Sequence, residues 1–384
     1  MIEIGLVGCP NSGKSTFFKA ATLKDVKIAP YPFTTLEPNE GLAHVTVKCP
    51  CTELKLQCKK CVDGVRFVPM KLWDVAGLVP DAHLGRGRGN AFLDDIMQTK
   101  AFIHVLDASG KTDSEGNAAD GFDPSQNVRM LERELDYWLL NIMEKDWKIL
   151  SDKNFFEILA KRFSGLGIDE NDIKKALSES SLDENTRNWR ESDELRFINN
   201  LRLISKPMLI AANKVDVLSS EKNIEKMKSE FQEYNIIPTS TEIELALREA
   251  AKENLIKYIP GANAFEITGE LSDKQKNALD FIKKFIERRN TGVQETLNRT
   301  VFDLLGMIVV YPVADQHKFT DKYNNVLPDA LLLKRGATAL DLAYEVHQDI
   351  GKKFIAAVDA RTGKNVSADY KLKDGDIISI KSGR

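Results

Sequence analysis

A glycine-rich segment near the N-terminus constrains the fold of this chain more than any other feature. Residues 8–15 read Gly-Cys-Pro-Asn-Ser-Gly-Lys-Ser and fit the pattern G-x-x-x-x-G-K-[S/T]. An apolar run at residues 2–7 precedes the segment, and a helical run at residues 16–21 follows it. Glycines let such a loop curl so that its backbone N–H groups point at phosphate groups. The context therefore favours a strand, a phosphate-binding loop and a helix over a chance glycine-rich turn.

Further apolar runs predict a parallel sheet that is covered on both faces. They occupy residues 2–7, 65–73, 102–107, 207–212 and 235–237, with helical stretches between them. Nearly continuous apolar strands are typical of buried parallel sheets, and the crossovers that join them are right-handed. We expect an α/β P-loop NTPase domain with a doubly wound sheet.

The chain has 384 residues, which is too many for one hydrophobic core. Residues 120–205 have helical apolar spacing and carry thirteen Lys or Arg against eighteen Asp or Glu, so we expect a mildly acidic helical insert. Residues 272–289 predict a helix with Ser272 at its N-cap.

The C-terminal part predicts a small α+β module. Strands are expected at residues 307–313, 354–359 and 376–381, with a helix at 338–350 and a turn at Asp374-Gly375. The predicted domains are therefore the P-loop domain (1–119 and 206–270), the helical insert (120–205), a helical connector (271–304) and the α+β module (305–384).

Two segments at strand ends predict the phosphate and Mg²⁺ ligands. In the loop at residues 8–15, Lys14 can reach the β and γ phosphate oxygens, and the Ser15 hydroxyl can ligate Mg²⁺. In the segment at residues 74–77, Asp74 can hold Mg²⁺ through water, while the N–H of Gly77 can sense a γ-phosphate. The residues that we expect to surround the phosphates and Mg²⁺ are Asn11, Ser12, Gly13, Lys14, Ser15, Thr16 and Asp74.

Asn213-Lys214-Val215-Asp216 follows an apolar strand and predicts how the base is chosen. Asp216 can accept hydrogen bonds from N1–H and the N2 amine of guanine, whereas adenine offers neither. Sites built on such pairing reject the wrong partner by up to roughly 10⁴–10⁵-fold. The stem of Lys214 can cover one face of the base. A solvated loop is the alternative interpretation of Asn213–Asp216.

With these motifs the chain resembles the Obg-like GTPases, in the archaeal and fungal group related to YchF, over nearly its whole length. The resemblance also rests on Tyr-Pro-Phe-Thr-Thr-Leu-Glu-Pro-Asn at 31–39 and on Asp-Val-Ala-Gly-Leu-Val-Pro at 74–80. Gly-Arg-Gly-Arg-Gly-Asn at 85–90 and the C-terminal module complete it.

This resemblance implies roles for further residues. Residues 31–39 would form switch I, with Thr35 as a Mg²⁺ ligand and Thr34 as the alternative, and residues 77–90 would form switch II. Ser240 would contact guanine. The C-terminal module would be a TGS domain with a β-grasp fold. YchF favours ATP and has Glu where this chain has Asp216, so we expect GTP here.

The expected catalytic groups are Lys14, Thr35 and Gly77, and turnover is expected to be slow. Leu78 stands where Ras-like GTPases carry a water-orienting glutamine, and a leucine cannot hold a water. Asn11 matches an asparagine that helps to bind K⁺ in related GTPases, although it also suits a tight turn. Arg86 and Arg88 could reach the γ-phosphate, or could be solvated loop residues.

Four of the five cysteines crowd into one segment: Cys49, Cys51, Cys58 and Cys61. Four thiolates can close a tetrahedral Zn²⁺ site. Two disulfides and plain thiols are the alternatives. We expect a structural role on a hairpin.

A formal net charge of −3 argues against attraction of the whole chain to nucleic acid or anionic lipid. The N-terminus has no basic leader, and no apolar run is long enough to span a bilayer, so we expect a cytoplasmic protein without membrane or DNA partners. The resemblance implies a link to the ribosome or RNA through the C-terminal module. The competing hypotheses are an ATPase of the YchF type and a nucleotide-sensing adaptor with incidental turnover.

Overall fold

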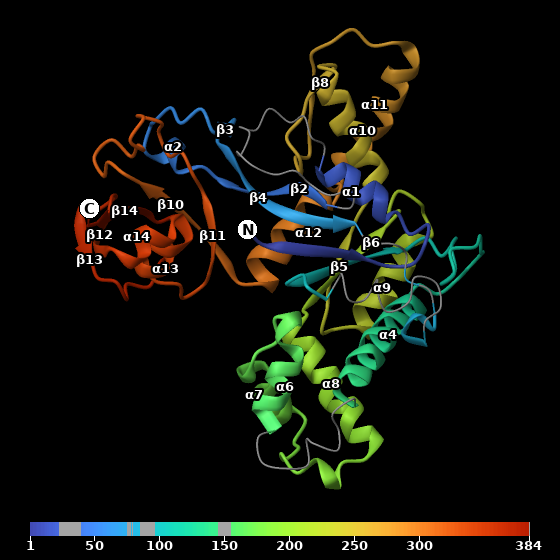
Figure 1. The fold of residues 1–384 in the computed structure, drawn as a ribbon. Coiled ribbons are helices and arrows are strands. Elements are labelled where there is room, and N and C mark those ends of the chain that lie inside the picture. The colour runs from blue at the N-terminus through green and yellow to red at the C-terminus, as the bar shows by residue number, and fades with distance from the viewer. Residues whose placement is uncertain (23–39, 75–77, 79, 85–96, 145–154, 384) are drawn as a thin grey trace.

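The computed structural model describes residues 1–22, 40–74, 78, 80–84, 97–144 and 155–383. Its largest sheet has seven strands, in the order β2-β4-β1-β5-β6-β7, with β3 also paired to β4 (Figure 1). These strands are β1 (Glu3–Val7), β2 (Glu40–Lys48), β3 (Cys61–Val62), β4 (Val65–Asp74), β5 (Ala101–Asp107), β6 (Met208–Asn213) and β7 (Asn235–Pro238). The neighbours from β4 to β7 are parallel, whereas β2 and β3 run antiparallel to β4.

The parallel strands are buried on both faces, as their continuous apolar runs predict. Every residue of β5 is buried. Phe102 and Leu106 belong to the core on the side of α4 (Ser125–Glu144), and Ile103 and Val105 belong to the core that contains Phe17 of α1 (Lys14–Thr22). The expected doubly wound α/β fold is confirmed.

Several helices among the described residues between β5 and β6 lie in the lower part of Figure 1. They are α4, α6 (Phe155–Phe163), α7 (Glu170–Glu179) and α8 (Glu191–Ser205), and α9 (Ser220–Glu230) follows β6. Leu131, Leu135, Trp138 and Leu139 are buried on one side of α4, as their helical spacing predicts. This helix packs on the face of the large sheet that carries Phe102 and Leu106.

The chain after β7 returns to the large sheet. It contains α10 (Thr241–Lys252), the ribbon β8 (Ile256–Lys257) and β9 (Glu266–Ile267), α11 (Asp273–Ile286) and α12 (Val293–Arg299). Ser272 caps α11 by accepting a hydrogen bond from Gln275, as predicted. Gln294 donates to the His44 carbonyl at 2.9 Å and Asn298 accepts from the Thr46 N–H at 2.9 Å, so α12 is fixed to β2.

The C-terminal module has a five-stranded sheet in the order β11-β10-β14-β12-β13. The strands are β10 (Met307–Val313), β11 (Leu331–Lys334), β12 (Phe354–Asp359), β13 (Lys364–Val366) and β14 (Ile377–Ser382). Central β10 and β14 are parallel and the other pairs are antiparallel. Helix α13 (Ala339–Val346) covers one face through Leu342. The expected β-grasp architecture is confirmed.

One predicted helix in this module was wrong in its extent. The structure divides residues 338–350 into α13 and α14 (Gln348–Lys352), because His347 has an extended backbone. The His347 ring accepts a hydrogen bond from the Asp349 N–H at 3.1 Å and so caps α14. His347 is exposed, which agrees with a surface histidine.

Candidate functional site

The loop at residues 8–15 connects β1 to α1 and requires its glycines. Gly8 has φ +142°, and a Cβ there would lie 2.1 Å from the carbonyl oxygen of Val105. Gly13 has φ +99°, and its Cβ would lie 2.1 Å from Nδ2 of Asn213. Only glycine adopts such conformations without strain, and only glycine leaves room for the neighbouring strands. The loop is therefore pressed against the ends of β5 and β6.

Lys14 is buried beneath this loop. Its ammonium donates a hydrogen bond to the Cys9 carbonyl at 2.8 Å. Burial lowers the pKa of Lys14, while the nearby Cys9 and Asp74 oppose the shift. A buried ammonium is stabilised by an anionic partner, and phosphate oxygens are suited to that role.

Asp74 lies at the end of β4, next to the loop. Its register partner is Leu6, and the structure brings its carboxyl group within hydrogen-bond reach of Ser15. Burial raises the pKa of Asp74, against the effects of the Ser15 hydroxyl and of Lys14. Among the described residues, the buried Asp74 Oδ1 has no hydrogen-bond partner. A hard cation with oxygen ligands fits this pair, as the sequence predicts for Mg²⁺.

Further unsatisfied polar atoms lie close to the same loop. Within the described ranges, Ser12 Oγ and Thr241 Oγ1 are buried and make no hydrogen bond. Native interiors rarely leave such atoms unpaired, so these atoms are available to a bound ligand.

Other members of the expected site, namely Thr34, Thr35, Gly77, Arg86 and Arg88, lie outside the described residues.

Asn213 connects the base-recognition segment to the phosphate loop. It is 1% exposed, and its Nδ2 donates to the carbonyl oxygen of Ser12 at 2.9 Å. Its Oδ1 accepts from the Thr241 N–H at 3.1 Å and from the Thr239 hydroxyl at 3.5 Å. One side chain therefore fixes the ends of β6 and β7 to residues 8–15.

Lys214 makes a second connection between the two segments. It has φ +65°, and its ammonium donates to the Asn11 carbonyl at 3.0 Å and to Asp107 Oδ2 at 2.9 Å. Its stem extends across the loop rather than into solvent. The structure thus brings together the residues that the two sequence motifs select.

Asp216 and Ser240, which are predicted to contact the base, are hydrogen-bonded to each other. The Ser240 hydroxyl donates to Asp216 Oδ1 at 2.6 Å, and Asp216 is otherwise exposed. Ser240 itself is fully buried, and its N–H donates to the Thr291 carbonyl at 2.9 Å. A carboxylate held in one orientation, with its remaining lone pairs open, can accept two hydrogen bonds from a base edge.

The segment after β5 is a part of the site that sequence reasoning missed. Asp107 accepts hydrogen bonds from Ser109, Thr112 and Lys214, and these hold its pKa below the usual value although burial alone would raise it. The side chain of Asn11 donates to the Gly116 carbonyl at 2.8 Å. The only signal in the sequence was an Asp at a strand end, followed by a glycine-containing turn.

Leu78 does not reach into the site. Its side chain is 2% exposed and belongs to the same core as Val7 and Phe102, while its N–H donates to the Gly8 carbonyl at 3.0 Å. A side chain buried in this way cannot orient an attacking water. The expected slow turnover stays a prediction.

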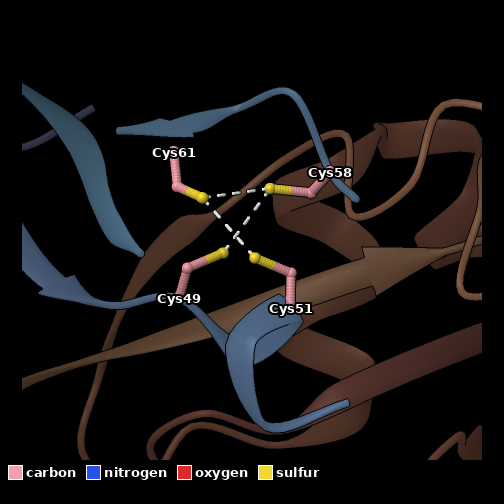
Figure 2. A group of neighbouring side chains, drawn as sticks. All are labelled: Cys49, Cys51, Cys58 and Cys61. Atoms are coloured by element: carbon pink, nitrogen blue, oxygen red, sulfur yellow. Dashed lines mark hydrogen bonds between the residues drawn. The ribbon is translucent and has the colours of Figure 1, made fainter. Parts of the chain in front are cut away.

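The four clustered cysteines form a second candidate site, away from the phosphate loop. Their sulfur atoms all lie within 4.8 Å of one another, so the group could hold a metal ion (Figure 2). Sulfur separations are 3.7 Å for Cys49–Cys58 and 3.5 Å for both Cys51–Cys61 and Cys58–Cys61. The fifth cysteine, Cys9, lies in the phosphate loop and is not part of this group.

The phosphate loop, the Asp74 strand end and the Asn213–Asp216 segment together define a P-loop GTPase domain, here followed by a β-grasp module. Three family models match the chain. They are "50S ribosome-binding GTPase" over residues 3–145, "Obg-like GTPase YGR210-like, G4 motif-containing domain" over 211–315 and "TGS domain" over 323–382.

Relatives cover the whole chain. It is 52% identical over 394 residues to the "Uncharacterized GTP-binding protein MJ1332" of Methanocaldococcus jannaschii, covering 100% of this chain and 99% of that one. It is 34% identical to the "Uncharacterized GTP-binding protein C428.15" of Schizosaccharomyces pombe, with 88% of each covered. A crystal structure of a GTP-binding protein from Pyrococcus horikoshii OT3 matches all of both chains, at 39% identity and a TM-score of 0.79. The chain belongs to the Obg-like GTPases, in their YchF-related group with a C-terminal TGS domain.

No helix among the described residues has both the length and the apolar character needed to cross a bilayer.

Proposed function

We propose that this protein binds GTP with Mg²⁺, hydrolyses it slowly and acts as a nucleotide-dependent switch. The observation that carries the proposal is the oriented, open carboxylate of Asp216, held by Ser240 beside a phosphate loop to which Asn213 is bonded. Selection of guanine and binding of phosphates are then joined in one rigid unit. Membership of the Obg-like GTPases supports hydrolysis as the reaction.

Each residue has a proposed task. The backbone of residues 8–15 cradles the α and β phosphates, and Lys14 neutralises charge on the β and γ oxygens. Ser15, Asp74 and Thr35 hold Mg²⁺, which when bound supplies further charge neutralisation. The N–H of Gly77 reports the γ-phosphate. Ser12, Gly13 and Thr16 line the phosphate path.

We propose that turnover is slow because Leu78 replaces a side chain that could position the attacking water. In phosphoryl transfer most of the catalysis is positioning and charge stabilisation, and no leucine can position water. Because Leu78 is packed in the core, a partner or a cation must supply what is missing.

Base selection provides the direct test. We expect fluorescent GTP and GDP analogues to bind at least 100-fold more tightly than the matching adenine nucleotides, because Asp216 meets hydrogens only on guanine. Multi-turnover phosphate release should require Mg²⁺. Equal or tighter binding of ATP would contradict the proposal.

The ATP alternative has a specific basis. A relative from Bacillus subtilis that is 26% identical over 406 residues is named "Ribosome-binding ATPase YchF". The geometry around Asp216 favours guanine here, so we propose GTP as the substrate. An ATP preference in the test above would establish the alternative.

We also propose that the switch acts in the cytoplasm on the ribosome or RNA, through the TGS module. The support is the TGS family model over residues 323–382 and the name of the Bacillus subtilis relative, "Ribosome-binding ATPase YchF". Sedimentation with ribosomal subunits in the GTP-analogue and GDP states tests it. We expect co-migration in one nucleotide state only. Turnover that subunits do not change, together with nucleotide-dependent co-migration, would favour an adaptor.

A further inference from the structure

The four cysteines gather at the closed end of the β2–β4 hairpin. Cys49 directly follows β2, and its N–H donates to the Gly64 carbonyl at 2.8 Å. Cys51 lies in the single turn of α2 (Pro50–Glu53), and Cys61 begins β3, where it pairs with Arg66. We call residues 49–64 the cysteine loop. It holds only four helical and two strand residues, so little backbone structure supports it.

The sulfur positions fit one tetrahedral ion better than two disulfides. With Zn–S bonds of about 2.3 Å, the edges of a tetrathiolate tetrahedron measure about 3.8 Å. The three sulfur–sulfur separations of 3.5, 3.5 and 3.7 Å are close to that edge. Cys58 contacts both Cys49 and Cys61, and Cys61 also contacts Cys51 (Figure 2). Disulfides would divide the sulfurs into separate pairs, whereas here the close contacts run in a chain from Cys49 through Cys58 and Cys61 to Cys51.

Backbone donors are already aimed at the sulfurs. The Lys60 N–H lies 3.4 Å from Cys58 Sγ, in a turn where Lys59 has φ +53°. The Cys51 N–H is likewise hydrogen-bonded to Cys49. These donors help to hold the sulfur atoms in place, and four sulfurs within 4.8 Å of one another leave a position between them that a cation can occupy.

The cysteine loop and the adjoining start of β4 also pack against the C-terminal module. Arg66 is 1% exposed and donates to the carbonyl oxygens of Leu327 and Pro328, at 3.0 Å each. Its guanidinium lies over the Tyr311 ring, 5.9 Å from the centroid. Three of the cysteines share one buried core with apolar residues of the C-terminal module, among them Tyr311, Val313, Leu327 and Ile377.

We propose that Cys49, Cys51, Cys58 and Cys61 bind one Zn²⁺ as a closed tetrathiolate, and that this site shapes the surface that holds the C-terminal module against the nucleotide domain. Four protein ligands leave no open position, so the ion is structural and not catalytic. Each thiol releases its proton on binding. Without Zn²⁺ the cysteine loop loses its main constraint, while β5 and β6 keep the core on the other face of the sheet, which contains none of the cysteines. This inference does not depend on the nucleotide specificity.

Metal content tests the first half. Dialysed full-length protein should contain one Zn²⁺ per chain, and replacement by Co²⁺ should give the absorption of a tetrahedral thiolate site. Cys58→Ser with Cys61→Ser should remove the metal, whereas Cys9→Ser, which alters a buried cysteine elsewhere, should keep one equivalent. Zinc well below one equivalent with four titrating thiols would overturn the site, and so would bound iron.

Hydrogen exchange tests the second half and does not need a variant. We expect zinc extraction from the wild-type chain to accelerate exchange of residues 307–313 and 327–334 at least tenfold, and re-addition of Zn²⁺ to reverse the change. Peptides from β5 and β6 should keep their protection, which serves as the internal control. Unchanged exchange in the C-terminal module after complete zinc loss would refute the docking role.

Discussion

At the scale of single residues, Asn213 shows which parts of the site a short sequence pattern can predict. Its position at a strand end, next to Lys214 and Asp216, follows from chemistry that tolerates few replacements. The pattern does not show that Asn213 bonds to the Ser12 carbonyl or that Asn11 bonds to the Gly116 carbonyl. Both contacts join segments that are more than one hundred residues apart, and local spacing does not encode such distances.

Asp216→Asn tests the choice of base at nearly constant shape. The amide can no longer accept two hydrogen bonds from guanine, and each bond to a charged group contributes about 1.5–3 kcal/mol. GTP affinity should fall by about 100-fold or more, which corresponds to about 2.7 kcal/mol. Xanthosine triphosphate, which offers one donor and one acceptor there, should gain affinity. Fluorescence titration measures both. Unchanged GTP binding would contradict the assigned role.

Asn11 supports a test of the K⁺ hypothesis. Its φ of +59° fits the tight-turn interpretation, and its Nδ2 is engaged by Gly116, which leaves the amide oxygen for a cation. We propose that K⁺ replaces an arginine finger, so GTP turnover should rise when K⁺ replaces Na⁺ at constant ionic strength. Phosphate release measures this. Equal rates in both salts would exclude the K⁺ hypothesis.

At the scale of elements, the periodicity of the sequence predicted which helices and strands exist better than it predicted where each one ends. The parallel strands of the large sheet and the N-cap of α11 lie where apolar runs and Ser272 indicate, whereas apolar runs did not predict the antiparallel strands β2 and β3. The break at His347 was missed because an extended residue inside an apolar helical pattern gives no local signal. The domain boundaries stay a prediction.

Helix α4 holds the segment that follows Leu78. The Glu134 carboxylate is 2% exposed and accepts from the N–H groups of Asp81 and His83, at 2.9 and 3.0 Å. Glu134→Ala should destabilise the protein by about 2 kcal/mol, because buried donors lose their acceptor. Exchange of both amides should accelerate. The exposed Asn141 of α4, changed to Ala, is the control and should alter neither. Unchanged exchange in the Glu134 variant would contradict this prediction.

Lys206 joins the residues just before β5 to the helical insert, and its burial predicts that stability depends on pH. It is 2% exposed and donates to the carbonyl oxygens of Thr99 and Leu166. Burial, aided by Lys100, lowers its pKa to about 7. Above pH 7 the unfolded chain binds more protons at this site than the folded chain, so stability rises with pH until the unfolded pKa near 10.4.

The comparison with Lys206→Met isolates this effect. The free energy of unfolding of the wild type minus that of the variant should increase by about 2 kcal/mol between pH 7 and pH 9. Denaturant titrations at each pH measure the difference. A constant or falling difference would show that the Lys206 pKa is not lowered.

At the scale of the whole molecule, two of the contacts that attach the C-terminal module are made by arginines, and these arginines differ in how far they are buried. Arg66 is buried and satisfies two carbonyls, whereas Arg361 pairs with the exposed Glu53 at 2.8 Å. Nothing in the sequence around Arg66 and Arg361 indicates which of the two is buried. Only the packed structure shows which contact is desolvated.

These two arginines form a matched pair of tests. Arg66→Met should destabilise the chain by about 2–4 kcal/mol and increase exchange at residues 327–328, because it leaves two buried carbonyls unpaired. Arg361→Ala should cost less than about 1 kcal/mol, as is usual for exposed pairs. Denaturation and hydrogen exchange measure both. Equal effects would mean that burial does not determine the strength of this attachment.

The hairpin formed by β2 and β4 is paired without interruption from Lys48 and Val65 to Glu40 and Trp73. Nine residues of strand span about 30 Å, so this hairpin has the cysteines at one end and Asp74 at the other. Because β4 is also paired with β1 from Lys71 to Asp74, the Asp74 end belongs to the central sheet. We therefore propose that a displacement of the C-terminal module is transmitted to Asp74, the proposed Mg²⁺ ligand, along one continuous pair of strands.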